Sequence, residues 1–192
     1  MGTVFNKKEL LVLLQDFHCL TGLRSAVFDS YGIEVLAYPP ELPAFCSLIR
    51  SVPEGKTGCY LCDQAACRNA TRQKKTIIYP CHAGLIEVIT PIQIDDAVVG
   101  FLLLSHIVQG EDENVEWAYA QKCCAAYNLD TNALHEAYNT LQRTPYPVLK
   151  SAADLLALAA AALYQKGMTR LASDSMQEKL SQYLAAHLHE NL

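Results

Sequence analysis

Two features that would indicate a membrane or nucleic-acid partner are missing from this sequence. The longest apolar stretch, 155–164, has ten residues, half of the ~20 that a helix needs to cross a bilayer. Fifteen basic residues stand against 20 acidic ones, so the formal net charge is −5, the wrong sign for a phosphate-binding surface. Neither a GxGxxG nor a P-loop pattern occurs. We therefore expect no membrane contact and no nucleic-acid contact by this chain itself.

The N-terminus also lacks the pattern of a signal peptide. Residues 1–14 contain Lys7, Lys8 and Glu9, and they have neither an uninterrupted apolar core nor a small-residue cleavage site. We expect a cytoplasmic protein, and in a reducing cytosol stable disulfides are rare. With 192 residues and 51% hydrophobic content, the chain can bury a full core without them.

Internal repeats and low-complexity tracts are absent as well, so we expect one folded core at 1–110 with a helical extension at 111–192. A hairpin is predicted over 25–38, and further strands over 76–80, 84–94 and 97–108. The predicted helices are 7–20, 45–51, 59–75, 115–127, 131–142, 148–165 and 174–190. This order predicts an α+β fold in which helices flank an antiparallel sheet, whose concave face suits a small ligand.

Cysteine, in contrast, is concentrated in one region. Five of the eight cysteines lie between residues 46 and 81, and His82 follows the last of them directly. In a reducing compartment such a cluster indicates metal ligands, catalysis or a redox switch. Small buried thiols that fill the core are the alternative.

Several short motifs resemble one known family, the PocR sensory domain, over roughly 14–110. The motifs are Phe45-Cys46, Glu54-Gly55, Cys59 with Asp63 four residues on, Cys81-His82-Ala83-Gly84-Leu85, Pro91-Ile92 and Gly100. The resemblance implies a PAS-like fold and the sensing of simple hydrocarbon derivatives such as small diols. Family members usually precede an AraC-type helix-turn-helix pair or belong to histidine kinases and other signalling proteins.

The 192 residues contain no helix-turn-helix pair, so we expect either the sensor module of a larger regulator or a stand-alone binder. Its function would be to bind a short diol, alcohol or related molecule and to relay occupancy to a transcriptional or signalling output. A cysteine-based metal or redox sensor is the alternative.

The resemblance and the residue types together indicate a ligand site. His82 is expected to grip a polar group of the ligand, and Glu87 and Asp63 are the acidic candidates for a hydrogen bond to a hydroxyl, because pockets use few well-placed polar groups. The full set of predicted ligand-binding residues is Phe45, Cys46, Asp63, Cys81, His82 and Glu87.

A zinc or iron site is a second expectation, because Cys59 and Cys62 form the C-x2-C pair typical of zinc ligands. Cys67 and Cys81 would complete the set. On a continuous helix, however, Cys67 lies about 140° further round than Cys62. Adjacent strand residues point to opposite faces, so Cys81 and His82 reach one site only if a turn or bulge intervenes.

An enzyme is not expected, because a cysteine nucleophile needs a base within hydrogen-bond reach and a third group that orients the base. The neighbours Cys81 and His82 would point to opposite faces of a strand, which disfavours such a pair. The predicted helix at 174–190 carries an apolar stripe that includes Met176, Leu180 and Leu184. Such a stripe indicates either a homodimer or a signalling contact through this helix, or packing on the sheet.

Overall fold

The central strands form one antiparallel sheet in the computed structural model, which describes residues 3–110 and 112–171. The strand order across the sheet is β3-β2-β6-β5-β4. These strands are β2 (Arg24–Asp29), β3 (Glu34–Tyr38), β4 (Ile77–Pro80), β5 (Ile86–Ile94) and β6 (Ala97–Ile107). Asp95-Asp96 forms the turn between β5 and β6, where Ile94 pairs with Ala97. The predicted α+β fold with an antiparallel sheet is confirmed.

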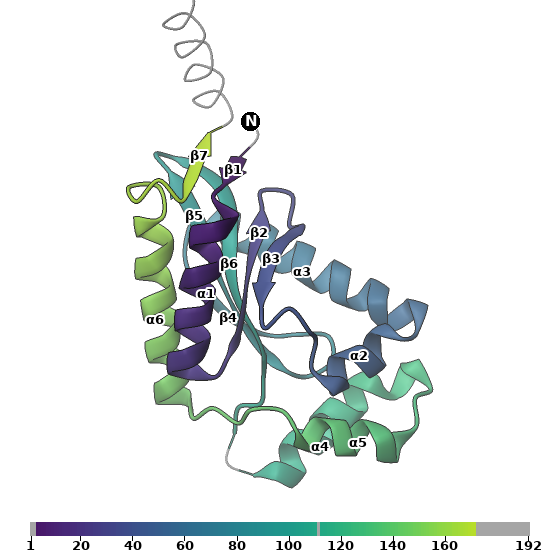
Figure 1. Cartoon of the computed structure of the whole chain (residues 1–192). Helices are drawn as coiled ribbons and strands as arrows, with labels where there is room; N and C mark the ends of the chain where they lie inside the picture. Colours follow the sequence, from purple (N-terminus) through teal and green to yellow (C-terminus); the bar gives the residue numbers. More distant parts are fainter. Residues whose placement is uncertain (1–2, 111, 172–192) are drawn as a thin grey trace, which may run out of the picture.

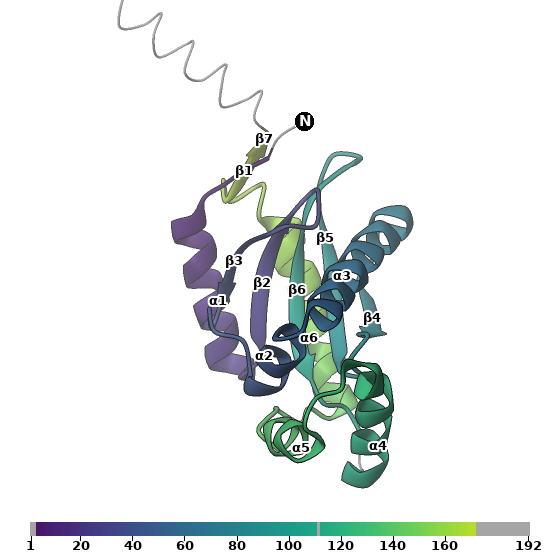
Figure 2. The same ribbon diagram turned by 90° about the vertical axis from the view of Figure 1, so that its right-hand side faces the viewer.

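Helices cover both faces of this sheet (Figures 1 and 2). The helices are α1 (Lys7–Thr21), α2 (Ala44–Arg50), α3 (Pro53–Gln73), α4 (Glu113–Cys124), the short 3-10 helix η1 (Ala125–Tyr127), α5 (Thr131–Asn139) and α6 (Tyr146–Ala162). α1 and α6 lie side by side on one face, and α3 lies on the other. α2, α4 and α5 gather at one end of the sheet.

The face under α1 and α6 is a continuous apolar layer. Leu102 and Leu104 of β6 pack with Leu10 of α1 and Leu156 of α6, and all four are at most 2% exposed. Alternate residues of a strand point to the same face, so Leu102 and Leu104 both belong to this layer. Because α6 completes this layer, residues after 110 share a core with residues before it, and the division at residue 110 stays a prediction.

The opposite face packs against α3 through small side chains. Phe101 and Leu103 of β6 contact a row on α3 formed by Ala66, Cys67 and Ala70. Small residues let a helix lie close to a sheet, and a buried cysteine serves there as a small apolar group. Cys67 is only 5% exposed and belongs to this packing.

Helix α3 begins at Pro53, six residues before the start predicted at residue 59. Proline suits the first helical position, since its missing N–H would have no partner there. Gly55 then lies so close to α2 that a Cβ would come within 2.0 Å of the backbone oxygen of Ile49. Packing between α2 and α3 thus explains a glycine in the first turn of the helix.

Two short strands were not predicted, because a strand of three residues is too short to show a hydrophobic period. β1 (Thr3–Phe5) pairs antiparallel with β7 (Thr169–Leu171), which brings the two ends of the described chain together (Figure 1). The helix predicted over 174–190 lies outside the described residues. The dimer or signalling contact expected there therefore stays a prediction.

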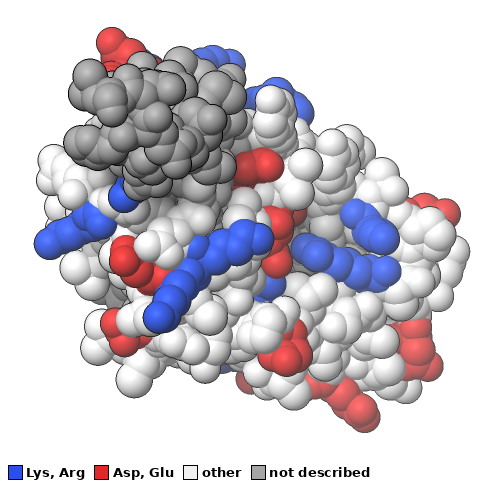
Figure 3. All heavy atoms as spheres, turned by 45° about the horizontal axis from the view of Figure 1, so that its top comes forward, with Lys and Arg blue, Asp and Glu red and all other residues white. Residues whose placement is uncertain are grey.

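Charged side chains of both signs are interspersed over the described part of the face drawn in Figure 3. On that face they form no extended patch of a single sign. Among the helices that the structure describes, none combines the length and the apolar character needed to cross a membrane.

Candidate functional site

A small inner cavity of about 20 Å³ lies between α2, α3 and the sheet. That volume holds roughly one water molecule. The side chains around the cavity are mostly thiols, imidazoles, carboxyls and one guanidinium. They belong to Cys46, Ile49, Arg50, Cys59, Cys62, Asp63, Cys81, His82, Ala83, Glu87 and His106.

Five of the six residues predicted to bind a ligand line this cavity: Cys46, Asp63, Cys81, His82 and Glu87. The sixth, Phe45, is fully buried and does not line it. The Phe45 ring packs edge-on against Tyr138, with 5.6 Å between ring centroids. The Phe45 side chain therefore helps to hold α2 in place without lining the cavity.

A turn brings Cys81 and His82 to the same cavity. β4 ends at Pro80, and the Cys81 N–H donates to the Leu85 carbonyl at 2.7 Å, while the Gly84 N–H donates to the Cys81 carbonyl at 3.0 Å. Gly84 has a φ of +84°, a conformation that favours glycine. The condition set by the sequence, an intervening turn, is thus met, and both side chains face one site.

A β-bulge places His106 opposite Glu87. Ile86 pairs with Ile107 and Val88 pairs with Leu104, so β6 carries one extra residue at this point. His106 takes a φ of +66°, which is unusual for a residue with a side chain and marks a bulge. Strict alternation would assign His106 to the face of Leu104. The sequence shows no turn signal that would reveal this change, and the prediction missed His106.

Glu87 is the most deeply buried carboxyl of the cavity, with 7% of its surface exposed. Burial, helped by the nearby Asp63 carboxyl, raises the pKa of Glu87 to about 8. The Tyr79 hydroxyl donates a hydrogen bond to Glu87 Oε2 at 2.8 Å. Glu87 is therefore mostly protonated at neutral pH, and it can both donate and accept hydrogen bonds.

The second carboxyl and the imidazoles of the cavity are also shifted toward their neutral forms. Burial raises the pKa of Asp63 to about 6, against the opposing effect of the Arg50 charge. Burial, with the charges of Arg24 and Arg50, lowers the pKa of His106 to about 3. His106 is consequently neutral, and its Nδ1 lies 3.0 Å from Ser105 Oγ.

The cavity thiols are protonated for the same reason. Burial raises the pKa of Cys62 to about 11, and it raises the pKa values of Cys46 and Cys81 strongly. Cys67 does not line the cavity; its side chain packs between α3 and the sheet. α3 continues unbroken from Pro53 to Gln73, so the structure does not gather the four predicted metal ligands Cys59, Cys62, Cys67 and Cys81 in one place.

Within residues 3–110 and 112–171, no group of three or more His, Cys, Asp or Glu side chains is arranged to hold a metal ion. Bound zinc or iron stays a prediction. Metal analysis of the purified protein tests it, with a tenth of an equivalent as the threshold below which the idea is abandoned.

His82 links α3 to η1 across the edge of the cavity. Its Nε2 lies 3.1 Å from Cys59 Sγ, and its Nδ1 lies 2.7 Å from the Tyr127 hydroxyl. Tyr127 was not among the predicted site residues. A tyrosine on a predicted helix carries no signal for a partner 45 positions away.

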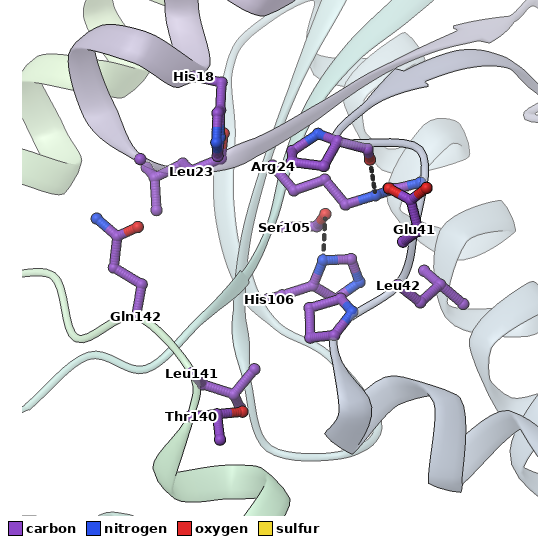
Figure 4. A pocket seen from close by; sticks show the side chains of 13 residues that line it. His18, Leu23, Arg24, Glu41, Leu42, Ser105, His106, Thr140, Leu141 and Gln142 are labelled. Carbon is purple, nitrogen blue, oxygen red and sulfur yellow. Dashed lines mark hydrogen bonds between the residues drawn. The ribbon is translucent and has the colours of Figure 1, made fainter.

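A larger, open pocket of about 320 Å³ adjoins the inner cavity (Figure 4). Its residues come from the end of α1, the start of β2, the end of β6 and the segments before α2 and after α5. Arg24 Nε donates to the Pro39 carbonyl at 3.0 Å, which holds the guanidinium at the pocket wall. His106 lines both hollows and forms part of the wall between them.

Comparison with known proteins agrees with the motifs. Residues 3–168 match the family model described as "Sensory domain found in PocR". The chain is 26% identical over 210 aligned residues to "Regulatory protein PocR" of Salmonella typhimurium, a match that covers 100% of this chain and 68% of that protein. No solved structure matches this chain significantly. The family match extends well beyond residue 110 and includes the helices that complete the core. The chain therefore belongs to the PocR sensory domain family.

Proposed function

We propose that this domain senses a small uncharged molecule with a hydroxyl group, such as a short diol or alcohol, in the inner cavity. The observation that carries the proposal is Glu87, a buried carboxyl in a cavity lined mostly by thiols, imidazoles and other ionisable groups. Ligand sites use a few well-placed polar groups to fix the orientation of the ligand.

The protonation state of Glu87 favours an uncharged ligand. A protonated carboxyl donates one hydrogen bond and accepts others, which matches a hydroxyl that also does both. Tyr79 holds Glu87 through its own hydrogen bond. An anionic ligand would meet Asp63 in the same cavity, and charge repulsion with its ionised form disfavours a carboxylate.

The size of the cavity links binding to movement. About 20 Å³ is too little for a molecule of two or three carbon atoms. The walls come from α2, α3 and the turn after β4, so a ligand fits only if these segments move apart. Occupancy then selects a different arrangement of the same segments, which is the requirement for a sensor.

The turn after β4 provides a route from the cavity to α4. A Cβ at Gly84 would lie 2.8 Å from the Ala120 Cα, so turn and helix are in close contact. Cys124 Sγ donates to the Ala83 carbonyl at 3.8 Å. We propose that a shift of this turn moves α4 and is relayed through the helical region to a transcriptional or signalling output.

Thermal unfolding of the 192-residue protein with two- to four-carbon diols, alcohols and carboxylic acids tests the proposal. We expect diols or alcohols to raise the Tm in proportion to the logarithm of their concentration, as preferential binding to the folded state requires. Carboxylic acids at pH 7 should have no such effect.

Variants then locate the site. Glu87→Leu should abolish the response, whereas Glu87→Gln, which keeps a neutral donor and acceptor, should retain it. The matched control is Gln93→Leu, a polar-to-apolar change on the same strand outside the cavity. Stabilisation by no compound, or an undiminished response of Glu87→Leu, would refute the proposal.

A further inference from the structure

Cys59, His82 and Tyr127 form a chain of thiol, imidazole and phenol. The distances are 3.1 Å from Cys59 Sγ to His82 Nε2 and 2.7 Å from His82 Nδ1 to the Tyr127 oxygen. A nucleophile within reach of a base that is itself oriented by a third group is the arrangement of nucleophilic sites. The sequence argument against an enzyme-like pair concerned Cys81 and His82. The structure pairs His82 with Cys59 instead.

Gly58 makes room for this chain of groups. A Cβ at residue 58 would lie 2.7 Å from His82 Nδ1 and 3.0 Å from the Tyr127 oxygen. Such approaches are closer than real Cβ atoms tolerate without movement of their neighbours. The glycine thus allows the imidazole and the phenol to rest directly against α3, beside Cys59.

The protonation states suit proton transfer during a reaction. Burial raises the pKa of Cys59, although the Arg50 guanidinium opposes this effect through a hydrogen bond and its charge. Burial and Arg50 lower the pKa of His82. Near pH 7 the pair is therefore a neutral thiol beside a neutral imidazole. In the tautomer with its proton on Nδ1, the imidazole offers its Nε2 lone pair to the thiol.

Cys59 can be reached from two sides. It lines the inner cavity, and it also lines an open groove of about 290 Å³ between the β2–β3 turn and α3. Arg50 and Lys56 line the same groove. The Arg50 charge favours a thiolate or an oxyanion at Cys59, against the opposing Asp63 carboxyl of the same groove.

We propose that Cys59 captures a small aldehyde reversibly as a hemithioacetal, with His82 as the base. The Cys59 sulfur forms a bond to the carbonyl carbon, and the C=O π electrons move to the oxygen. The thiol proton passes through His82 to that oxygen, so no oxidant and no leaving group are needed. The inner cavity has little space for a leaving group, which favours addition over acyl transfer.

This inference rests on the proposed sensing function, because it names an aldehyde as a ligand of the same cavity. Reversible addition suits a sensor, since the thiol returns to its free form when the aldehyde concentration falls. Tyr127 acts as a positioning residue that holds the imidazole toward the sulfur.

NMR of the full chain with [1-13C]ethanal tests the capture directly. We expect a protein-bound sp3 carbon resonance, distinct from the free aldehyde and its hydrate, that disappears on dilution. Cys59→Ser should lack it. Cys67→Ala, on the same helix but outside the cavity, should keep it. A wild-type spectrum without this resonance, or its persistence in Cys59→Ser, would overturn the proposal.

The role of His82 is tested by the rate at which iodoacetamide alkylates each cysteine, followed by peptide mass spectrometry. His82→Gln should slow alkylation of Cys59 by about 100-fold, the typical contribution of a general base, and leave the exposed Cys19 unchanged. Tyr127→Phe should shift the pH profile of Cys59 alkylation. Equal rates in wild type and His82→Gln would remove His82 as the base, and an unshifted profile would remove the positioning role of Tyr127.

Failure of this inference and failure of the proposed function give different results. If alcohols raise the Tm of wild type and Cys59→Ser equally while ethanal forms no adduct, the proposed sensing of a hydroxyl ligand is supported and aldehyde capture is refuted. If ethanal adds to Cys59 while no alcohol stabilises the protein, aldehyde capture is supported and binding of a hydroxyl ligand is refuted.

Discussion

The two faces of the sheet differ in chemistry although the same strands build both. Toward α1 and α6, β5 presents Val88 in a wholly apolar layer. Toward α2 and α3, the neighbouring residue of the same strand is Glu87 in a polar cavity. Because side chains alternate along a strand, one strand stabilises the fold with one set of residues and builds the site with the other.

The comparison indicates that residues facing α1 and α6 mainly stabilise the fold, whereas residues facing α2 and α3 mainly form the site. A substitution on the apolar face should reduce the free energy of unfolding and leave the ligand response of the folded protein intact. A substitution in the cavity should change protonation, reactivity or ligand response at smaller cost in stability. The following predictions test this separation.

The largest effect is expected for Leu104→Ala on the apolar face. Leu104 is fully buried, and truncation of a buried leucine removes apolar contacts and leaves a cavity, at a cost of about 2–5 kcal/mol. Urea denaturation measures the loss, and the Tm increase produced by a bound alcohol should remain. A loss below about 1 kcal/mol would contradict the assigned packing.

Glu87→Gln should change how stability depends on pH. The pKa of Glu87 is raised from 4.5 to about 8, so between these values the folded state binds a proton that the unfolded state has released. The free energy of unfolding therefore falls as pH rises toward 8, with at most about 1.4 kcal/mol per pH unit from this group. The substitution removes this contribution.

Urea denaturation between pH 6.5 and 8 isolates this effect. Asp63 and His106 also contribute to the pH dependence near the lower end of this range, because Asp63 titrates at about 6 in the folded protein and unfolding returns the buried His106 to its ordinary pKa of 6.5. Their contributions largely cancel in the difference between wild type and Glu87→Gln. Arg50 and Tyr79, which also face Glu87 and whose pKa values are raised, keep their charge state in this range. Parallel curves for wild type and Glu87→Gln would show that Glu87 is not protonated as described.

Gly58→Ala should disturb the site more than the fold. A Cβ would push against the His82 ring, and overpacking costs about 1–3 kcal/mol, whereas alanine in place of glycine gains up to about 1 kcal/mol of helix propensity. The net loss should be small. NMR titration should show the lowered pKa of His82 moving toward the ordinary histidine value as the ring is displaced. An unchanged His82 titration would contradict the contact.

The smallest effect is expected for Cys67→Ala. Cys67 packs beside Ala66 and Ala70, so alanine keeps most of that packing, and we expect a loss of about 1 kcal/mol. The ligand response and the alkylation of Cys59 should not change. Cys62→Ala provides the comparison on the same helix, because Cys62 lines the cavity and its loss should alter the ligand response.

Much of the fold followed from local pattern. The strands at 25–38, 84–94 and 97–108 and the entry helix at 7–20 were predicted within a few residues of their observed bounds, because apolar periodicity and turn residues are local signals. The start of α3 was misplaced, since Gly55 and Gly58 are explained only by the segments that pack against them.

The site was partly predictable for a related reason. Cys46, Cys81 and His82 were selected from motifs that resemble a family, and Glu87 was selected as an acidic candidate for a hydrogen bond to a hydroxyl. All four line one cavity. His106 and Tyr127 were not selected. His106 enters the cavity through a bulge in the pairing of β5 with β6, and Tyr127 through a contact that spans 45 residues.

By itself, the sequence determined the α+β class, the order of most elements and the region that carries the cavity, because these depend on hydrophobic period, turn chemistry and motif. Only the tertiary structure decided which cysteine pairs with His82, which cysteine fills the core and which carboxyl is protonated. Those properties depend on burial and on contacts between segments distant in the chain, and a linear pattern of residue types does not encode them.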